Sequence, residues 1–300
     1  MPDLPCASVR IGVLDVGSNT TRLLVASVEH GEVVPLDKEK VRLSLGEEIE
    51  RYGVVSDVHI VAAAKAVRKL AAAARKQGIE SLDVFVTAPG RQSGNAHALV
   101  AALTRAAGVP VRVLTTEEEG RLAYGGAVAT APIELPGTIA VCDVGGASTE
   151  IAVGSPGRVP DWVCSVDLGS VRLTTRLDSD RFGDDEHGDA LVETGSAFAG
   201  VEPARVEAAL AVGGSARAAR RLVGSTLGAD ELAEALRLVR RNPPRTISRR
   251  FGVDRARARI LPAGLVILAE VQSRIGVPLH VCDGGIREGA VLAWVAEAAA

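Results

Sequence analysis

A short turn motif occurs twice in this chain and constrains its fold more than any other feature. Residues 13–20 read Val-Leu-Asp-Val-Gly-Ser-Asn-Thr, and residues 141–149 read Val-Cys-Asp-Val-Gly-Gly-Ala-Ser-Thr. Each copy lies between two apolar runs, which predicts a β-hairpin with an acid, a glycine and hydroxyl groups at its tip. The aspartates, Asp15 and Asp143, are far apart in the sequence, so we expect two domains of similar design whose hairpins face each other across a cleft.

The length and the charge of the chain limit the class of protein to which it can belong. The chain has 300 residues, of which 47% are hydrophobic, enough to build two domains with their own cores. Its formal net charge is only −3, so no global charge draws it to nucleic acid or to an anionic membrane, and we expect neither partner. The first residues lack the basic and apolar regions of a signal peptide, which predicts a cytoplasmic protein.

The cysteines do not form a recognisable framework. Cys6, Cys142, Cys164 and Cys282 show no CxxC or Cys/His spacing, and the last three lie in apolar, strand-like runs. We therefore expect buried, reduced thiols rather than a zinc site or disulfide bonds.

Strand-like and helix-like segments alternate along the chain, which predicts an α/β fold. A helix beginning at Thr116, capped by Thr115 or Thr116, joins the two halves, and we place the domains at 1–125 and 126–300. The expected strands beyond the hairpins are 83–88, 111–114, 161–166, 208–212 and 279–283, and the expected helical ranges are 58–77, 96–107, 188–198 and 229–275.

Four strand-to-loop junctions combine glycine with a nearby arginine. Ligands of α/β sheets gather at the carboxyl ends of strands, where backbone donors and guanidinium groups could converge on phosphate. The alternatives are tight turning for the glycines and pairing with a nearby acid for the arginines. The junctions are Gly90 with Arg91, Gly169 with Arg172, Gly213 and Gly214 with Arg217, and Gly284 and Gly285 with Arg287.

Several carboxylates are candidates for chemistry. Asp15 and Asp143 could organise a metal ion or water, since Mg²⁺ prefers oxygen ligands, or each could cap its own turn. Glu150 could aim back at the cleft or lie exposed on an edge strand. The run Glu117–Glu119 is favourable at a helix N-terminus, but one member could also act as general base on an attacking water.

The order of these motifs resembles the exopolyphosphatase and guanosine pentaphosphate phosphohydrolase (Ppx/GppA) family of the actin-like ATPase superfamily. The resemblance covers essentially the whole chain. The motifs that carry it are residues 15–20, 87–91 with Asn95, 118–122, 143–150, 168–174, 213–217 and 285–289.

The resemblance implies two actin-like ATPase (ribonuclease H-like) domains with an interdomain cleft, and a homodimer. It implies that Glu118 is the catalytic base, that Asp143 binds Mg²⁺, with Mn²⁺ as the other candidate ion, and that Glu150 orients the metal or the water. Ala147 stands where the family commonly has glycine, which is tolerable at a negative φ. Together with the junctions, the predicted phosphate-binding residues are Asp15, Gly17, Ser18, Asn19, Thr20, Arg91, Gly145, Gly146, Ala147, Ser148, Thr149, Gly214, Ser215 and Arg287.

The predicted function is release of terminal orthophosphate from inorganic polyphosphate, preferably from short chains. Hydrolysis of pppGpp would use the same loops, and two further alternatives are a non-hydrolysing (p)ppGpp-binding regulator and a sugar-kinase-like phosphotransferase. The arginine-rich stretch 237–259 could follow a polyphosphate tail or meet a partner subunit, but a solvated helical face is the favoured interpretation.

Overall fold

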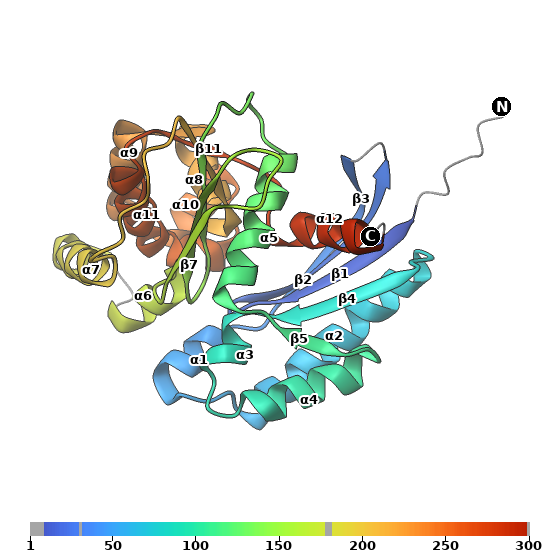
Figure 1. Cartoon of the computed structure of the whole chain (residues 1–300). Coiled ribbons are helices and arrows are strands. Elements are labelled where there is room, and N and C mark those ends of the chain that lie inside the picture. Colours follow the sequence, from blue (N-terminus) through green and yellow to red (C-terminus); the bar gives the residue numbers. More distant parts are fainter. Residues whose placement is uncertain (1–8, 30–31, 178–181, 299–300) are drawn as a thin grey trace.

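The computed structural model describes residues 9–29, 32–177 and 182–298 (Figure 1). Cys6 and the other first residues, which were considered for a signal peptide, lie outside these ranges. Within them, Cys142 and Cys282 are buried free thiols, as expected, and Cys164 is half-buried. None of the helices in the described ranges has the length and apolar character needed to cross a bilayer.

The first sheet combines an antiparallel meander with two parallel strands. Its strand order is β3-β2-β1-β4-β5, with β2 antiparallel to β1 and β3, and with β4 parallel to β1 and β5. The strands are β1 (Arg10–Val16), β2 (Thr20–Glu29), β3 (Glu32–Arg42), β4 (Ser81–Val86) and β5 (Val111–Val113).

The second sheet repeats this connectivity and adds one short strand. Its order is β10-β11-β9-β6-β7-β8, so the run from β8 to β11 corresponds to the whole first sheet. The repeated turn motif lies at the same place in both, between the central strand and its antiparallel neighbour, and the predicted fold class is confirmed. The strands are β6 (Ile139–Val144), β7 (Thr149–Gly154), β8 (Trp162–Val166), β9 (Ala208–Val212), β10 (Thr226–Leu227) and β11 (Leu279–Val281).

Helices cover one face of each sheet and form its core. On the first sheet, α2 and α4 bury residues such as Leu70 and Leu103 against Leu14 and Val84. On the second, α11 is the central buried helix and packs against α6, α8 and α9. These helices are α1 (Leu45–Tyr52), α2 (Asp57–Lys76), α3 (Ala88–Gln92), α4 (Ala96–Ala107), α6 (Ser170–Leu177), α7 (Asp184–Ala197), α8 (Gly213–Val223), α9 (Ala229–Arg241), α10 (Pro244–Phe251) and α11 (Arg255–Ile275).

Two helices between the sheets cross the predicted domain boundary. Helix α5 (Thr116–Ala129) begins after the first sheet but packs Tyr124 and Ala127 against the second. Helix α12 (Ile286–Ala298) ends the described chain but returns to the first sheet, where Val291 packs in one core with Val13 and Phe85 (Figure 1). The division into 1–125 and 126–300 therefore does not describe the packing of these two helices.

The expected elements form with small shifts in their bounds, and two segments differ in kind. Helix α1 was not predicted, and its N-cap, Ser44, makes no side-chain capping bond and takes a left-handed φ of 58°. The segment around Pro89 and Gly90, expected as loop, is the short helix α3, with proline in its first turn.

Candidate active site

The two predicted hairpins form, and their tips close in the same way. Strand β1 pairs with β2, and β6 pairs with β7, each antiparallel. At the first tip the amide of Gly17 donates to the carbonyl of Thr20 at 3.1 Å, and at the second the amide of Gly145 donates to the carbonyl of Ser148 at 3.0 Å. The sequence repeat is therefore a structural repeat.

The two tips lie against each other and line one pocket. A Cβ atom added to Gly146 would lie 3.2 Å from the Cβ of Ser18. Among the described residues, Ser44 is the only non-glycine with a positive φ, so Ala147 takes a negative φ, as expected. The predicted phosphate-binding residues that line the pocket are Asp15, Gly17, Ser18, Asn19, Thr20, Gly145, Gly146, Ala147, Ser148, Gly214 and Arg287.

Three carboxyl groups with raised pKa values, Asp15, Asp143 and Glu119, line this pocket, and burial is the main cause of each rise. A fourth, Glu150, is buried beside Asp143 but is not among the lining residues, and burial raises its pKa as well. The pKa of Asp15 rises to about 6, although Arg22 and Arg287 lower it. The pKa of Asp143 rises as well, despite nearby arginines. Because charge is costly in this environment, the pocket favours cationic or proton-donating ligands beside these oxygens.

The pKa values of Glu150 and Glu119 are raised by neighbouring carboxylates as well as by burial. Glu150 lies directly opposite Asp143 in the hairpin register and is 2% exposed. Burial raises its pKa to about 7, and the charge of Asp143 adds to the rise. Burial also raises the pKa of Glu119 well above its usual value, and the charge of Glu150 acts in the same direction. Ser165 donates a hydrogen bond to Glu150 at 2.9 Å.

Glu118 does not reach the pocket, which corrects the prediction that it faces the cleft. It is the third residue of α5, and its carboxylate accepts a hydrogen bond from the backbone amide of Thr115 at 2.7 Å. The Thr115 hydroxyl accepts from the Glu118 amide at 3.1 Å, which completes a capping box. The bond from the Thr115 amide is the main reason that the pKa of Glu118 is lowered. Because neighbouring side chains of a helix point in different directions, Glu119 lines the pocket instead.

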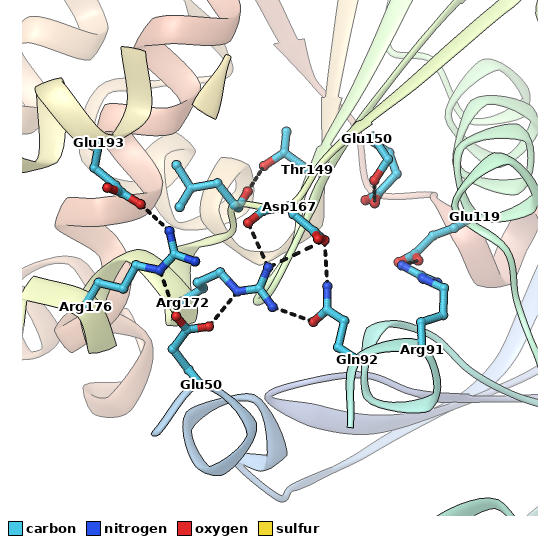
Figure 2. A network of polar contacts seen from close by, with 12 residues as sticks. Glu50, Arg91, Gln92, Glu119, Thr149, Glu150, Asp167, Arg172, Arg176 and Glu193 are labelled. Carbon is cyan, nitrogen blue, oxygen red and sulfur yellow. Dashed lines mark hydrogen bonds and ion pairs between the residues drawn. The ribbon is translucent and has the colours of Figure 1, made fainter. Parts of the chain in front are cut away.

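Arg91 supports Glu119 rather than lining the pocket. Its guanidinium forms an ion pair with Glu119 at 2.9 Å and donates to the carbonyl of Leu114 at 2.7 Å, as drawn in part in Figure 2. Both side chains of the pair are mostly buried, with 17% and 12% exposure. The pair fixes the direction of the Glu119 carboxylate from behind.

Two other predicted phosphate-binding residues also lie behind the pocket. Thr149 is fully buried, and its hydroxyl donates to the carbonyl of Leu168 at 2.7 Å. Ser215, in α8, is fully buried against α11, where a Cβ added to Gly264 would lie 2.5 Å from its hydroxyl oxygen. Neither side chain is among those that line the pocket.

Arginines from four separate elements line the pocket, and the sequence pointed to two of them, Arg217 and Arg287, at glycine junctions. Burial lowers the pKa of Arg217 to about 10 and that of Arg257 to about 9, and the charge of Arg22 adds to both shifts. Arg257 belongs to the arginine-rich stretch that was expected to be a solvated face, an interpretation that is wrong for this residue. A signal for Arg22 existed, since it follows the first tip and pairs with Asp15 across the hairpin.

Backbone atoms at the start of α8 form part of the pocket lining. Gly213 has a φ of 89°, and a Cβ at this position would lie 2.4 Å from a carboxylate oxygen of Asp143. Only glycine fits such a conformation without strain. The first two residues of α8, Gly213 and Gly214, and the first residue of α12, Ile286, line the pocket, where helix dipoles favour anions.

The carboxylates at the pocket supply some, but not all, of the ligands that a divalent cation needs. In the described ranges, no group of three or more His, Cys, Asp or Glu side chains is arranged to hold a metal ion by itself. Asp143 and Glu150, adjacent and both with raised pKa values, supply the hard oxygen donors that Mg²⁺ takes. Since Mg²⁺ commonly uses one or two carboxylates together with substrate phosphates and water, these residues fit an ion that is bound jointly with the substrate.

Comparisons with known proteins agree with this architecture. The model of the Ppx/GppA phosphatase family matches residues 24–298. Exopolyphosphatase 1 of Mycobacterium tuberculosis is 27% identical over 95% of this chain and 88% of its own length. An uncharacterized protein of Streptomyces coelicolor is 34% identical over 55% of this chain, a match that spans about half of that protein, 49%.

Solved structures give the same fold. The Ppx/GppA family member of Aquifex aeolicus superposes with a TM-score of 0.80 over 97% of this chain and 98% of its own, at 23% identity. Such a likeness concerns the fold alone, so the chemistry of this chain has to be argued from its own pocket.

Proposed function

This chain belongs to the Ppx/GppA phosphatase family, and from that premise we propose that it is an exopolyphosphatase, which releases terminal orthophosphate from inorganic polyphosphate. The observation that carries the proposal is the pocket itself. Two acid-tipped turns face each other there, arginines from four elements converge, and one buried carboxylate, Glu119, comes from a third direction on α5.

In the proposed reaction a water molecule attacks the terminal phosphorus, and the bond from that phosphorus to the bridging oxygen breaks. Glu119 accepts the proton of the water. Its raised pKa makes it a stronger base than an ordinary glutamate, and its ion pair with Arg91 holds it in one direction. The arginines and the backbone at both tips offset the charge that develops on the phosphate oxygens.

Asp143 and Glu150 would hold Mg²⁺, or Mn²⁺ in its place, together with phosphate oxygens of the substrate. The ion would neutralise part of the phosphate charge when bound. It would also relieve the repulsion between these two carboxylates, which is one cause of the raised pKa of Glu150. This assignment predicts that chelation of divalent cations abolishes phosphate release.

The remainder of a polyphosphate chain has a basic surface to follow. A second pocket shares Arg22, Arg217, Arg257 and Arg287 with the first and continues outward from it. Its acidic lining residues are Glu39 and Asp254. Its cationic lining residues are Arg22, Lys38, Lys40, Arg42, Arg217, Arg220, Arg221, Arg257 and Arg287.

The lining of these pockets favours polyphosphate over pppGpp. Among the described residues that line either pocket, none is aromatic, so the site offers no ring on which a guanine base could stack. Guanidinium groups and backbone donors recognise phosphate oxygens whatever they are attached to.

The direct test is phosphate release with Mg²⁺ from tripolyphosphate, long-chain polyphosphate and pppGpp, measured side by side. We expect release from the two inorganic substrates at higher kcat/KM than from pppGpp. Faster release from pppGpp would reverse the assignment. Tight (p)ppGpp binding without any release would identify a regulator, and transfer of labelled γ-phosphate from ATP to an organic acceptor would identify a kinase.

Neighbouring glutamates on α5 provide a matched pair of variants. Glu119→Gln removes the proposed base and should lower kcat for tripolyphosphate by roughly 10²-fold or more. Glu118→Gln can keep the capping box and removes only a charge at the N-terminus of α5, so kcat should stay within about a factor of two, while the free energy of unfolding falls by roughly 0.3–1 kcal/mol. A larger kcat loss in Glu118→Gln than in Glu119→Gln would contradict the assignment.

The proposal also includes a homodimer in the cytoplasm. The dimer comes from the family resemblance. Sedimentation of the purified chain and fractionation of cells that express it would test the two expectations.

A further inference from the structure

Each phosphate-binding turn is supported from behind by its own helix. In the first half, the amide of Gly46 at the start of α1 donates to the carbonyl of Ser18 at 2.7 Å. The fit is close, since a Cβ added to Gly46 would lie 2.7 Å from the Cβ of Ser18. The amide of Leu43, just before α1, donates to the carbonyl of Asn19 at 3.0 Å. A movement of α1 therefore moves the first turn.

The second turn rests on α6 in the corresponding way. The amide of Val171 donates to the carbonyl of Gly146 at 2.8 Å, and the amide of Ser170 donates to the carbonyl of Gly145 at 3.0 Å. The Ser170 hydroxyl donates to the same Gly145 carbonyl, also at 3.0 Å. A Cβ added to Gly169 would lie 2.5 Å from the carbonyl carbon of Gly146, so this helix too is in direct contact with its turn.

One glutamate of α1 joins these two supporting helices. Glu50 accepts a hydrogen bond from Nε of Arg172 on one oxygen and from Nε of Arg176 on the other, each at 2.7 Å (Figure 2). The side chains of Glu50 and Arg172 are only 16% and 10% exposed. A charged pair that is this well buried and hydrogen-bonded fixes geometry more strongly than a surface ion pair does.

Arg172 also reaches the elements beside the pocket. Its guanidinium donates to the side-chain oxygen of Gln92 on α3 and to the carbonyl of Asp167, at 2.7 and 2.8 Å. The amide of Gln92 donates to the carboxylate of Asp167 at 2.7 Å (Figure 2). Helix α3 carries Arg91, the partner of Glu119, so the network connects both turns with the element that holds the proposed base.

We propose that Glu50 and Arg172 are positioning residues that set the separation of the two phosphate-binding turns by linking the helices that support them. This inference rests on the proposed function for its consequence in turnover, but its structural part does not. With the link broken, α1 and α6 can separate, and the tips that meet at Ser18 and Gly146 no longer bind one phosphate group together.

The test compares two glutamates that contact the same arginine. Glu50→Gln breaks the link between α1 and α6. Glu193→Gln is the matched control, because Glu193 pairs with Arg176 from α7 within the second half (Figure 2). With tripolyphosphate and Mg²⁺, we expect KM to rise about tenfold or more in Glu50→Gln, with a smaller fall in kcat, and both constants to stay within about twofold in Glu193→Gln.

Amide hydrogen exchange of the substrate-free chain gives a readout that does not depend on turnover. The amides of Gly46 and Val171, which hold the two turns, should exchange faster in Glu50→Gln than in the unmodified chain, and at an unchanged rate in Glu193→Gln. Equal exchange in Glu50→Gln and the unmodified chain would overturn the inference. So would faster exchange with an unchanged KM.

These two readouts separate the inference from the proposed function. A chain that hydrolyses none of the inorganic substrates would refute the proposed function, whereas the exchange comparison would still decide whether Glu50 couples the turns. Should Glu50→Gln fail to fold, Arg176→Gln removes one of the two bonds to Glu50 and should give the same changes at smaller size. No change in that variant would count against the proposal.

Discussion

At the scale of a single residue, the burial of Asp15 in the pocket lowers the stability of the folded protein at neutral pH. Burial raises its pKa from the usual 3.8 to about 6, so the folded chain binds a proton more tightly than the unfolded chain does. Between pH 3.8 and about pH 6 the folded state holds more protons than the unfolded state. The free energy of unfolding therefore falls as the pH rises through this range. Above about pH 6 the full penalty is present.

Replacing this charge should stabilise the protein. We expect Asp15→Asn to raise the free energy of unfolding at pH 8 by up to about 3 kcal/mol, and the difference to shrink towards zero near pH 4. Urea unfolding at both pH values measures the effect, with Asp189→Asn, an exposed position on α7, as the control that should match the unmodified chain. A gain that is equal at both pH values would show that the charge of Asp15 is not its cause.

Individual site residues could be predicted from the sequence only where a motif fixes the direction of a side chain. Both hairpin tips were predicted correctly because a turn between two strands has few geometries. The choice between Glu118 and Glu119 depends on which of them caps α5, and a run of three acids does not reveal that. Arg257 could not be assigned either, because its burial depends on how α11 meets the first half of the chain.

At the scale of elements, the crossing of α5 and α12 depends on the absence of side chains. A Cβ added to Gly126 on α5 would lie 1.9 Å from the carbonyl oxygen of Gly285, and one added to Gly289 on α12 would lie 1.9 Å from that of Leu122. The two backbones are therefore as close as they can be. This contact holds the start of α12, with Arg287, against the pocket.

Adjacent glycines on α5 make this prediction testable. Gly126→Ala should lower the free energy of unfolding by roughly 1–3 kcal/mol, through steric overlap, and should also lower phosphate release. A Cβ added to Gly125 meets nothing within 4 Å, so Gly125→Ala should stabilise the protein by roughly 0.5–1 kcal/mol through helix propensity alone. Thermal unfolding of both variants checks the signs, and equal effects would contradict the close crossing.

The elements themselves could largely be predicted, and the exceptions have physical causes. Helix α4 has the predicted bounds, since its alanine-rich pattern ends at Gly108, which takes the left-handed conformation of a C-cap. Helix α1 could not be predicted, because it lacks a capping side chain and is held by contacts with α6 and with the first turn. The crossing of α5 and α12 also depends on contacts between distant segments.

At the scale of the whole molecule, charge is distributed unevenly. The chain has a net charge of −3, yet the basic extension of the pocket gathers nine lysine and arginine side chains beside only two acids, Glu39 and Asp254. An anionic polymer is therefore attracted to one region of a protein that is slightly acidic overall. Such attraction is screened by salt.

The outer part of the extension should matter only for long substrates. Lys40→Ala and Arg221→Ala remove exposed cations from it, and we expect each to raise KM for long-chain polyphosphate a few-fold at low salt, while KM for tripolyphosphate is unchanged. High salt should remove the difference. Arg237→Ala, on α9 outside the extension, is the control. An equal effect on both substrates would mean that the extension does not carry the chain.

The return of α12 to the first sheet has a consequence for synthesis of the protein. Val13, Leu24 and Phe85 leave the ribosome early, but the apolar residues that cover them on this face, Val291 and Trp294, are translated some two hundred residues later. Until then this face of the first sheet, whose strands have already been translated, is an exposed apolar surface of the nascent chain. Chaperones that hold such surfaces would therefore be needed until α12 has been translated.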